Sequence, residues 1–297
     1  MRTDSRAIAG VVVALSVVMP RVHVAHAQAP AVTDVKQVLK KVADGLGMLR
    51  SVREEDSLMT VEFWGSGTMN EIGTAAAPGR AYKVTKYYGA VAYDFPGMRL
   101  DIMRTADGTA PQREIQVVSG AFAWNEDQPG AGLVPGRGSA VPAMDAVNDR
   151  LLRLWTTPFG IYKAAAAAGA NAKVTNEGGR LVLTFPLTQA GIQGPTSNVV
   201  VGALGGTPVK VTLNAQYRPE RVEVRYGGRM IETTYSDYGD LNDKDTKADI
   251  FFPARIVQTV DGRPALALTI EKTNTYNPYV ILPVPENVEK AGAGRAR

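Results

Sequence analysis

Acidic side chains are densest in the stretch ETTYSDYGDLNDKDTKADIFFPARI, residues 232–256. Carboxylate oxygens are the ligands that calcium prefers, and a calcium-binding loop supplies them at fixed steps around a glycine that allows a sharp bend. Here Lys247 occupies the third ligand position and no glycine follows it. We therefore interpret the stretch as an enlarged, solvated turn between two strands and predict no metal site. Its aspartates are Asp237, Asp240, Asp243, Asp245 and Asp249.

Paired carboxylates are a second possible source of chemistry, because glycoside cleavage needs one acidic group and a second carboxylate at a defined distance. Acidic residues recur along the predicted strands, but no spacing singles out a pair. Arginines stand at neighbouring positions, so each acid is more simply half of a cross-strand charge pair. Catalytic residues therefore stay unassigned. The acids are Glu62, Asp101, Glu114, Glu223 and Glu232, and the arginines are Arg99, Arg113, Arg221 and Arg225.

The chain offers few other nucleophiles or bases. Cysteine is absent, and both histidines, His23 and His26, lie in an N-terminal segment that we expect to be removed. A Ser-His-Asp triad, a Cys-His pair and a conventional zinc site are therefore excluded, and no cofactor is indicated. An enzyme of this composition would have to use carboxylate, tyrosine, lysine or arginine side chains.

That N-terminal segment has the order of a secretory signal peptide. Two arginines precede the apolar run AIAGVVVALSVVMP, and small residues at Ala25 and Ala27 fit a cleavage site after Ala27. We expect residues 1–27 to be a signal peptide, 28–288 to form one domain and 289–297 to be a disordered tail. The product would be periplasmic or secreted, and its mature chain would have no transmembrane segment.

The charge pattern gives no sign of nucleic-acid binding. The formal net charge is +4, and removal of Arg2, Arg6, Arg21 and Asp4 lowers it by two. Basic residues alternate with acids, as in RPERVEVRYGGR at 218–229, and do not form a basic patch. We therefore predict no nucleic-acid partner.

Aromatic side chains give the strongest functional signal. They gather in the N-terminal half and on a predicted helix pair, where a curved sheet lined by them would enclose an apolar cavity for an acyl chain or similar ligand. The alternative is that they only join helices to the sheet as part of the core. The candidate cavity residues are Phe63, Trp64, Tyr88, Phe122, Trp124, Trp155 and Phe159.

Period-two alternation of apolar and polar residues dominates the chain. It predicts an antiparallel sheet, because no regular alternation of strands with helices appears. The clearest hairpin spans 219–238, where a two-residue GG turn at 227–228 would pair Val224 with Ile231. A second hairpin is expected to turn at the DG pair 261–262. Further strands are expected at 58–68, 82–94, 98–105, 113–125, 180–187 and 209–217.

Three stretches break this pattern with helical spacing. Residues 33–50 predict an amphipathic helix capped by Thr33, and residues 143–155 predict another. Thr157 and Pro158 then supply the N-cap and the first-turn proline of a third helix. These helices need a partner surface, which we expect to be the sheet.

Six segments between residues 65 and 270 carry a further signal. They are GSGT at 65–68, YDFPGMRLDIMRT at 93–105, QVVSGAFAWN at 116–125, LLRLWTTPFGIYKAA at 151–165, ETTYSDY at 232–238 and FFPARIVQTVDGRPALALTI at 251–270. In this order they resemble the N-terminal region that precedes the metallo-β-lactamase-fold domain in certain exported bacterial proteins. That region is similar to the LolA/LppX type of periplasmic fold. The resemblance implies a mainly β (α+β) domain, a strongly curved antiparallel half-barrel with helices packed on its concave side.

Two departures limit what the resemblance implies about activity. The chain has no HxHxDH motif and stops near YVILPVPENV at 279–288, where such proteins continue into the metal-binding domain. Family members often carry histidine at the position of Phe159. Hydrolase activity is therefore not carried over.

Together these features favour a periplasmic binding or carrier protein for a lipid or another hydrophobic ligand. Two Gly/Pro-rich loops, 125–143 and 188–208, are expected to gate entry. Two alternatives stay open. One is a histidine-free hydrolase or lyase acting on an exported polymer, and the other is an accessory module for a separately encoded periplasmic metallo-hydrolase.

Overall fold

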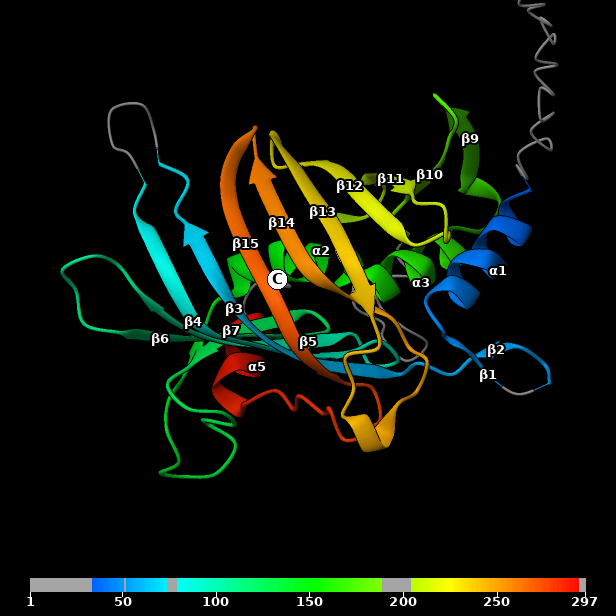
Figure 1. Cartoon of the computed structure of the whole chain (residues 1–297). Coiled ribbons are helices and arrows are strands. Elements are labelled where there is room, and N and C mark those ends of the chain that lie inside the picture. The colour runs from blue at the N-terminus through cyan, green and yellow to red at the C-terminus, as the bar shows by residue number, and fades with distance from the viewer. Residues whose placement is uncertain (1–33, 51, 74–78, 189–203, 294–297) are drawn as a thin grey trace, which may run out of the picture. The chain divides into compact units, whose positions relative to one another are not determined.

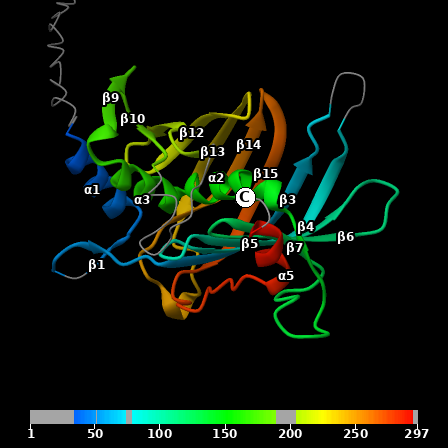
Figure 2. The same ribbon diagram turned by 180° about the vertical axis from the view of Figure 1, so that it is seen from behind.

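One antiparallel sheet of 13 strands dominates the computed structural model of the chain, which describes residues 34–50, 52–73, 79–188 and 204–293 (Figures 1 and 2). The predicted signal peptide, its cleavage site and most of the loop 188–208 lie outside these residues. The strands of the sheet are β3 (Thr60–Asn70), β4 (Ala81–Ala92), β5 (Gly97–Thr105), β6 (Gln112–Ser119), β7 (Phe122–Glu126), β8 (Ala140–Pro142), β9 (Lys173–Glu177), β10 (Arg180–Pro186), β11 (Pro208–Leu213), β12 (Pro219–Tyr226), β13 (Arg229–Gly239), β14 (Phe252–Val260) and β15 (Arg263–Asn274).

Helices and a small hairpin complete the described part of the chain. The hairpin pairs β1 (Leu49–Arg50) with β2 (Glu55–Asp56). The α-helices are α1 (Val35–Gly45), α2 (Val147–Trp155), α3 (Pro158–Ala168) and α5 (Glu286–Ala293), and short 3-10 turns lie at Met144–Ala146, Gly169–Asn171 and Lys244–Thr246. None of the described helices is long and apolar enough to cross a membrane.

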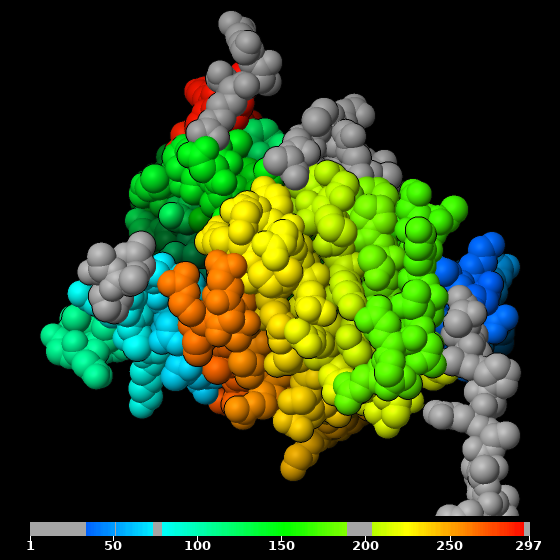
Figure 3. Space-filling view, turned by 90° about the horizontal axis from the view of Figure 1, so that it is seen from above, coloured from blue at the N-terminus to red at the C-terminus, as the bar shows by residue number. Residues whose placement is uncertain are grey.

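The sheet consists of two meanders joined at a seam. Strands β3 to β8 pair in chain order, as do β9 to β15, and β15 pairs with β3 to connect the two sets. Figure 3 shows the orange residues of the second meander directly beside the cyan residues of the first. The sheet curves but stays open, with β8 and β9 at its edges. The predicted mainly β fold with an antiparallel sheet is therefore confirmed.

Both predicted hairpins form in the expected register. In the first, Val224 pairs with Ile231 across a turn in which Gly227 and Gly228 have φ of 58° and 77°, angles that glycine adopts without strain. In the second, β14 turns into β15 so that Val260 pairs with Arg263, and a bulge lies at residues 258–259, just before the turn. The residues at the two turns therefore determine which residues pair in this part of the sheet.

The chain crosses from one edge of the sheet to the other through α2 and α3. Thr157 caps α3 by accepting a hydrogen bond from the Gly160 backbone, and Pro158 occupies the first turn, as predicted. Helix α2 contacts β5, β6 and β7 of the first meander, whereas α3 contacts β10 of the second. We call the face of β3 to β7 against which this helix pair packs the α2 face.

The opposite face of the first meander is covered by the C-terminal segment, and we call it the α5 face. Val288 of α5 is fully buried in a cluster with Ile115, Val117 and Trp124, and Leu282 joins the same cluster. Earlier in the segment, Val280 packs on alanines of β4. Strands β6 and β7 therefore lie between two packed layers.

Three predicted boundaries were wrong. The stretch 113–125 is not one strand, because Gly120 takes a φ of 55° and turns β6 into β7. The helix predicted for 33–50 ends at Gly45, since Gly47 has a φ of 73° and its α-carbon lies against the Asp249 carbonyl. Its cap is Asp34, whose carboxylate accepts a hydrogen bond from the Gln37 backbone at 2.8 Å.

The predicted disordered tail also begins too early, because α5 continues to Ala293. An ion pair of 2.5 Å between Lys290 and Glu286, one helical turn apart, and the burial of Val288 account for this helix. Residues 294–297 lie outside the described part of the chain.

Candidate functional site

A cavity lies on the α2 face, between the C-terminal end of α2 and strands of both meanders. Its volume is about 210 Å³, and we call it the α2 cavity. Most of its wall is apolar, and the strands on either side of the seam contribute to it. The apolar and aromatic residues that line it are Phe63, Met69, Tyr87, Met98, Leu100, Tyr235, Ile256, Ala265, Leu266 and Leu268.

A smaller hollow of about 140 Å³ adjoins the α2 cavity. The two share Arg153, Thr156, Thr233 and Gln258 as lining residues, so they form one continuous depression. The smaller hollow is also lined by charged, exposed side chains, which makes it the polar mouth of the cavity. These side chains are Asp149, Arg153 and Arg229.

Two tyrosine hydroxyls fix the helix pair over the cavity. The Tyr235 hydroxyl of β13 donates a hydrogen bond of 2.7 Å to the Thr156 carbonyl. The Tyr93 hydroxyl, just after β4, lies 2.9 Å from the Thr157 hydroxyl. Because burial raises the pKa of both tyrosines, both hydroxyls keep their protons at neutral pH. The junction between α2 and α3 is thus held by both meanders.

An aromatic cluster forms the floor of the cavity. The Phe63 ring stacks on Tyr87 and on Phe252, with ring centroids 6.2 Å and 5.3 Å apart, and Phe159 packs on Phe252 with ring centroids 5.7 Å apart. Gly89, which pairs with Phe63 across β3 and β4, makes room for this ring. A β-carbon at that position would lie 2.2 Å from the ring.

The structure separates the seven predicted cavity residues into three groups. Phe63 lines the α2 cavity, and Trp155 and Phe159 lie in the core behind it. The other four belong to the α5 face, where Trp64 packs on Tyr88 with ring centroids 5.1 Å apart. There Trp124 is fully buried, and Phe122 packs against its cluster. The four residues on the α5 face are Trp64, Tyr88, Phe122 and Trp124.

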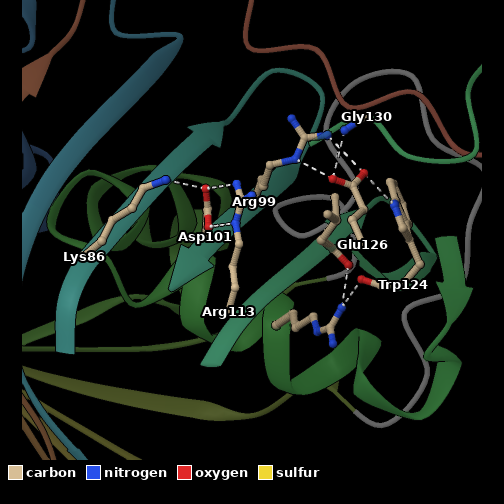
Figure 4. Close-up of polar contacts among 9 residues, drawn as sticks. Lys86, Arg99, Asp101, Arg113, Trp124, Glu126 and Gly130 are labelled. Atoms are coloured by element: carbon tan, nitrogen blue, oxygen red, sulfur yellow. Dashed lines mark hydrogen bonds and ion pairs between the residues drawn. The ribbon is translucent and has the colours of Figure 1, made fainter. Parts of the chain in front are cut away.

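The α5 face holds a network of buried charges (Figure 4). The Glu126 side chain is completely buried and accepts two hydrogen bonds of 3.1 Å from the Arg99 guanidinium. It also accepts bonds of 3.0 Å from the Trp124 indole and from the Gly130 backbone. All of its acceptor capacity is used within the fold, so this carboxylate has no role left for a ligand.

Asp101 is paired in the same way in the middle of β5. Its side chain is 3 % exposed and lies 2.5 Å from the Lys86 ammonium and 2.8 Å from the Arg113 guanidinium. Burial alone would raise the pKa of Asp101, but the bonds from these two cations bring it below its ordinary value. Asp101 is therefore an ionised partner of two cations, as the predicted charge pairing requires.

The remaining predicted carboxylates also have partners. Glu62 accepts hydrogen bonds from the Tyr88 hydroxyl at 2.6 Å and from the Asn274 and Asn277 amides at 3.0 Å. Glu114 pairs with Arg104, while Glu223 and Glu232 share Arg221. Of the arginines predicted to pair, all but Arg225 are found in these ion pairs of the described residues.

The aspartate-rich loop folds around one of its own carboxylates. Asp240 accepts hydrogen bonds from the backbones of Asn242, Ala248 and Asp249. Burial raises the pKa of Asp240, but a hydrogen bond from the Asn242 side-chain amide, together with these backbone bonds, lowers it below its ordinary value. Among the described residues, no group of three or more acidic or histidine side chains is placed to hold a metal ion.

Two arginines of α2 carry roles that the sequence did not suggest. Arg150 is 6 % exposed and donates to the Val117 and Trp124 carbonyls at 2.8 Å and 2.6 Å, and burial lowers its pKa to about 10. Arg153 lies three residues on and remains exposed at the cavity mouth. Their spacing on one helix indicated proximity, but no sequence signal separated a buried arginine from an exposed one.

The loop 125–143, predicted to gate the cavity, is bound to itself on the α5 face. The Ser139 backbone donates to the Asp127 carboxylate at 2.9 Å, and Gly132 lies against Pro285 of the C-terminal segment. None of its described residues lines the α2 cavity. Most of the second predicted gate, 188–208, lies outside the described residues.

Comparisons with known proteins give little further information. No family model matches the chain, and no curated protein matches it. Among solved structures, the crystal structure of the Mycobacterium tuberculosis lipoprotein LppX matches with a TM-score of 0.25 and 12 % sequence identity, over 65 % of this chain and 88 % of that chain. A TM-score of this size carries no argument, so the fold and the site rest on the elements and contacts described above.

Proposed function

We propose that the protein binds a hydrophobic small molecule or lipid chain in the α2 cavity and acts as a carrier. The observation that carries this proposal is the continuous apolar wall that Phe63, Leu100, Tyr235, Ile256 and Leu268 form under α2. Burial of apolar surface supplies roughly 25 cal/mol per Å², so a ligand that fills such a wall gains affinity without any catalytic group. The helices would then lie on the concave side of the sheet, as lids over the ligand.

The charged groups of the chain support a binding role better than a catalytic one. The carboxylates on the predicted strands of the first meander are held in ion pairs or hydrogen bonds with Arg, Lys, Tyr or Asn side chains. A general acid or base needs a carboxyl that is free to exchange a proton with substrate. The α2 cavity, in contrast, is lined by no carboxylate of the described residues other than Asp149 at its mouth.

We further propose that the protein works after export, in the periplasm or outside the cell. The order of charged, apolar and small residues in the first 27 positions supports this. The alternative is an accessory role beside a separate metallo-hydrolase. Purified protein that carries no bound molecule would favour this alternative.

The test is native mass spectrometry of the protein purified without detergent, followed by organic extraction. We expect a stoichiometric hydrophobic adduct. A Leu266→Trp variant fills the cavity and should lose the adduct, whereas Thr269→Trp, on an exposed position of the same strand, should keep it. An adduct that survives in a folded Leu266→Trp protein would contradict the assignment of the α2 cavity as its site.

A further inference from the structure

The α2 cavity is lined by a polar atom that the described fold does not use. Tyr87 is 4 % exposed and lines the cavity, yet within the described residues its hydroxyl forms no hydrogen bond. The hydroxyls of Tyr88, Tyr93 and Tyr235 all have partners. This hydroxyl is not one of the fully enclosed polar atoms that lack a partner, so it is reached from the cavity, and a group that enters the cavity can form a hydrogen bond to it.

A cation with spare donors lines the same cavity as this hydroxyl. Arg153 lines both the cavity and its mouth, and its charge acts on Tyr87: burial raises the pKa of Tyr87, and Arg153 opposes that rise. Its guanidinium donates one hydrogen bond, of 3.0 Å, to the Gln116 side chain. Within the described ranges no carboxylate lies within ion-pair distance of Arg153, which leaves most of its five N–H donors for a ligand.

The rest of the mouth adds positive charge. Arg229 faces it from the start of β13, and the nearest acid, Asp149, lies 4.0 Å away with both side chains at least half exposed. Such a loose pair holds neither partner firmly. The neighbouring acid Glu114 is engaged by Arg104 at 3.1 Å. The mouth therefore presents two arginines against one weakly bound aspartate, an arrangement that attracts an anion.

The size of the cavity limits the apolar part of the ligand. Pockets that hold drug-sized molecules measure about 300–1,000 Å³. The α2 cavity, at about 210 Å³, is smaller and shares lining residues with the mouth. One slender chain fits this shape, and two parallel acyl chains do not.

We propose that the α2 cavity selects a single-chain amphiphile with an anionic head, the head bound by Arg153 and the Tyr87 hydroxyl and the chain lying along Met98, Leu100 and Leu268. This inference rests on the proposed function and narrows it to one chemical class. A carboxylate, sulfate or phosphate head would satisfy the same donors.

The test measures binding of decanoate by isothermal titration calorimetry at low salt, with decanol and decyltrimethylammonium as probes of equal chain length. Decanoate should bind most tightly. In an Arg153→Gln protein the dissociation constant for decanoate should rise about tenfold or more, because a charge-assisted hydrogen bond is lost, while that for decanol stays the same. Arg225→Gln, an exposed arginine on the sheet outside the cavity, is the matched control.

A Tyr87→Phe protein separates the hydroxyl from the ring. It should bind decanoate several-fold more weakly than the parent protein and should unfold at the same temperature, because the hydroxyl bonds to nothing in the free fold. Unchanged binding of decanoate in both Arg153→Gln and Tyr87→Phe would overturn the inference.

The remaining outcomes distinguish this inference from the proposed function. Equal binding of decanol and decanoate, or tighter binding of the cation, would overturn the anionic head and leave a hydrophobic carrier. Binding of a two-chain phosphatidylglycerol in place of decanoate would overturn the single chain. Failure of every amphiphile to bind, together with a ligand-free mass, would overturn the proposed function itself.

Discussion

The two faces of the first meander use polar groups in opposite ways. On the α5 face, which the C-terminal segment covers, Arg99 pairs with Glu126 and Asp101 pairs with Arg113. On the α2 face, within the described part of the chain, the Tyr87 hydroxyl lines the cavity without a hydrogen-bond partner and Arg153 donates one hydrogen bond. Tyr87 and Tyr88 are adjacent in β4, yet they belong to these two different environments.

This difference shows which polar residues stabilise the fold and which are available to a ligand. Burial of a charge is tolerated only when its hydrogen bonds are satisfied, so a fully bonded network such as that of Glu126 is part of the architecture. Donors that remain free at a cavity have no such structural function. The α5 face was rich in the residue types that suggest a site, but the candidate site lies on the other face.

Among the variants that distinguish the two faces, Glu126→Gln is expected to lower the free energy of unfolding most. The change leaves the Arg99 guanidinium without its buried partner, and breaking such a pair costs about 3–5 kcal/mol of the free energy of unfolding. Denaturation in guanidinium chloride measures this loss. The folded variant should bind its hydrophobic ligand with unchanged affinity, because Glu126 does not line the α2 cavity.

Glu177→Gln is the control for that variant. Its ion pair with Lys210 is 2.8 Å long but exposed, and its removal should leave stability unchanged within error. A loss of less than about 1 kcal/mol for Glu126→Gln would contradict the structural role of the network.

Gly89→Ala tests the α2 face. The added methyl group would meet the Phe63 ring at 2.2 Å, and overpacking of this kind costs about 1–3 kcal/mol. Since Phe63 lines the cavity, the shifted ring should also weaken ligand binding, unlike the change at Glu126. Gly239→Ala, where the nearest side-chain atom lies at 3.5 Å, should leave both quantities as they are.

The smallest and sharpest comparison is between Tyr88→Phe and Tyr87→Phe. Tyr88 loses its hydrogen bond to the Glu62 side chain, which should cost about 1.5 kcal/mol because the tyrosine is partly exposed. Tyr87 loses no bond in the free protein, so its change in unfolding free energy should stay within about 0.5 kcal/mol. Equal effects at the two positions, measured by thermal unfolding without ligand, would remove the distinction between the faces.

The sequence predicted the local structure better than the site. The GG turn at 227–228 and the Thr157-Pro158 start of α3 depend on residues close together in the chain, and both were predicted correctly. Side chains alternate along a strand, so the adjacent residues Phe63 and Trp64 must lie on opposite faces of the sheet. This pattern already predicts that only one of them can line the cavity.

Two features could not be predicted because they depend on long-range packing. The cover of the α5 face includes Leu282 and Val288, which follow the buried Trp124 by more than 150 positions in the chain. The aromatic floor likewise joins Phe63 to Phe252, which belong to different meanders. No spacing in the chain indicates that such residues meet.

The seam between β3 and β15 has a consequence for the order of folding. β3 is the first strand of the sheet along the chain and β15 is the last, yet the two strands pair. Leu268, for example, lies opposite Gly67. Closing so long a loop is slow, whereas the hairpins on either side need only local contacts. We therefore expect each meander to form early and the seam to close last. The capacity to hold a ligand would then arise abruptly, at the final step of folding.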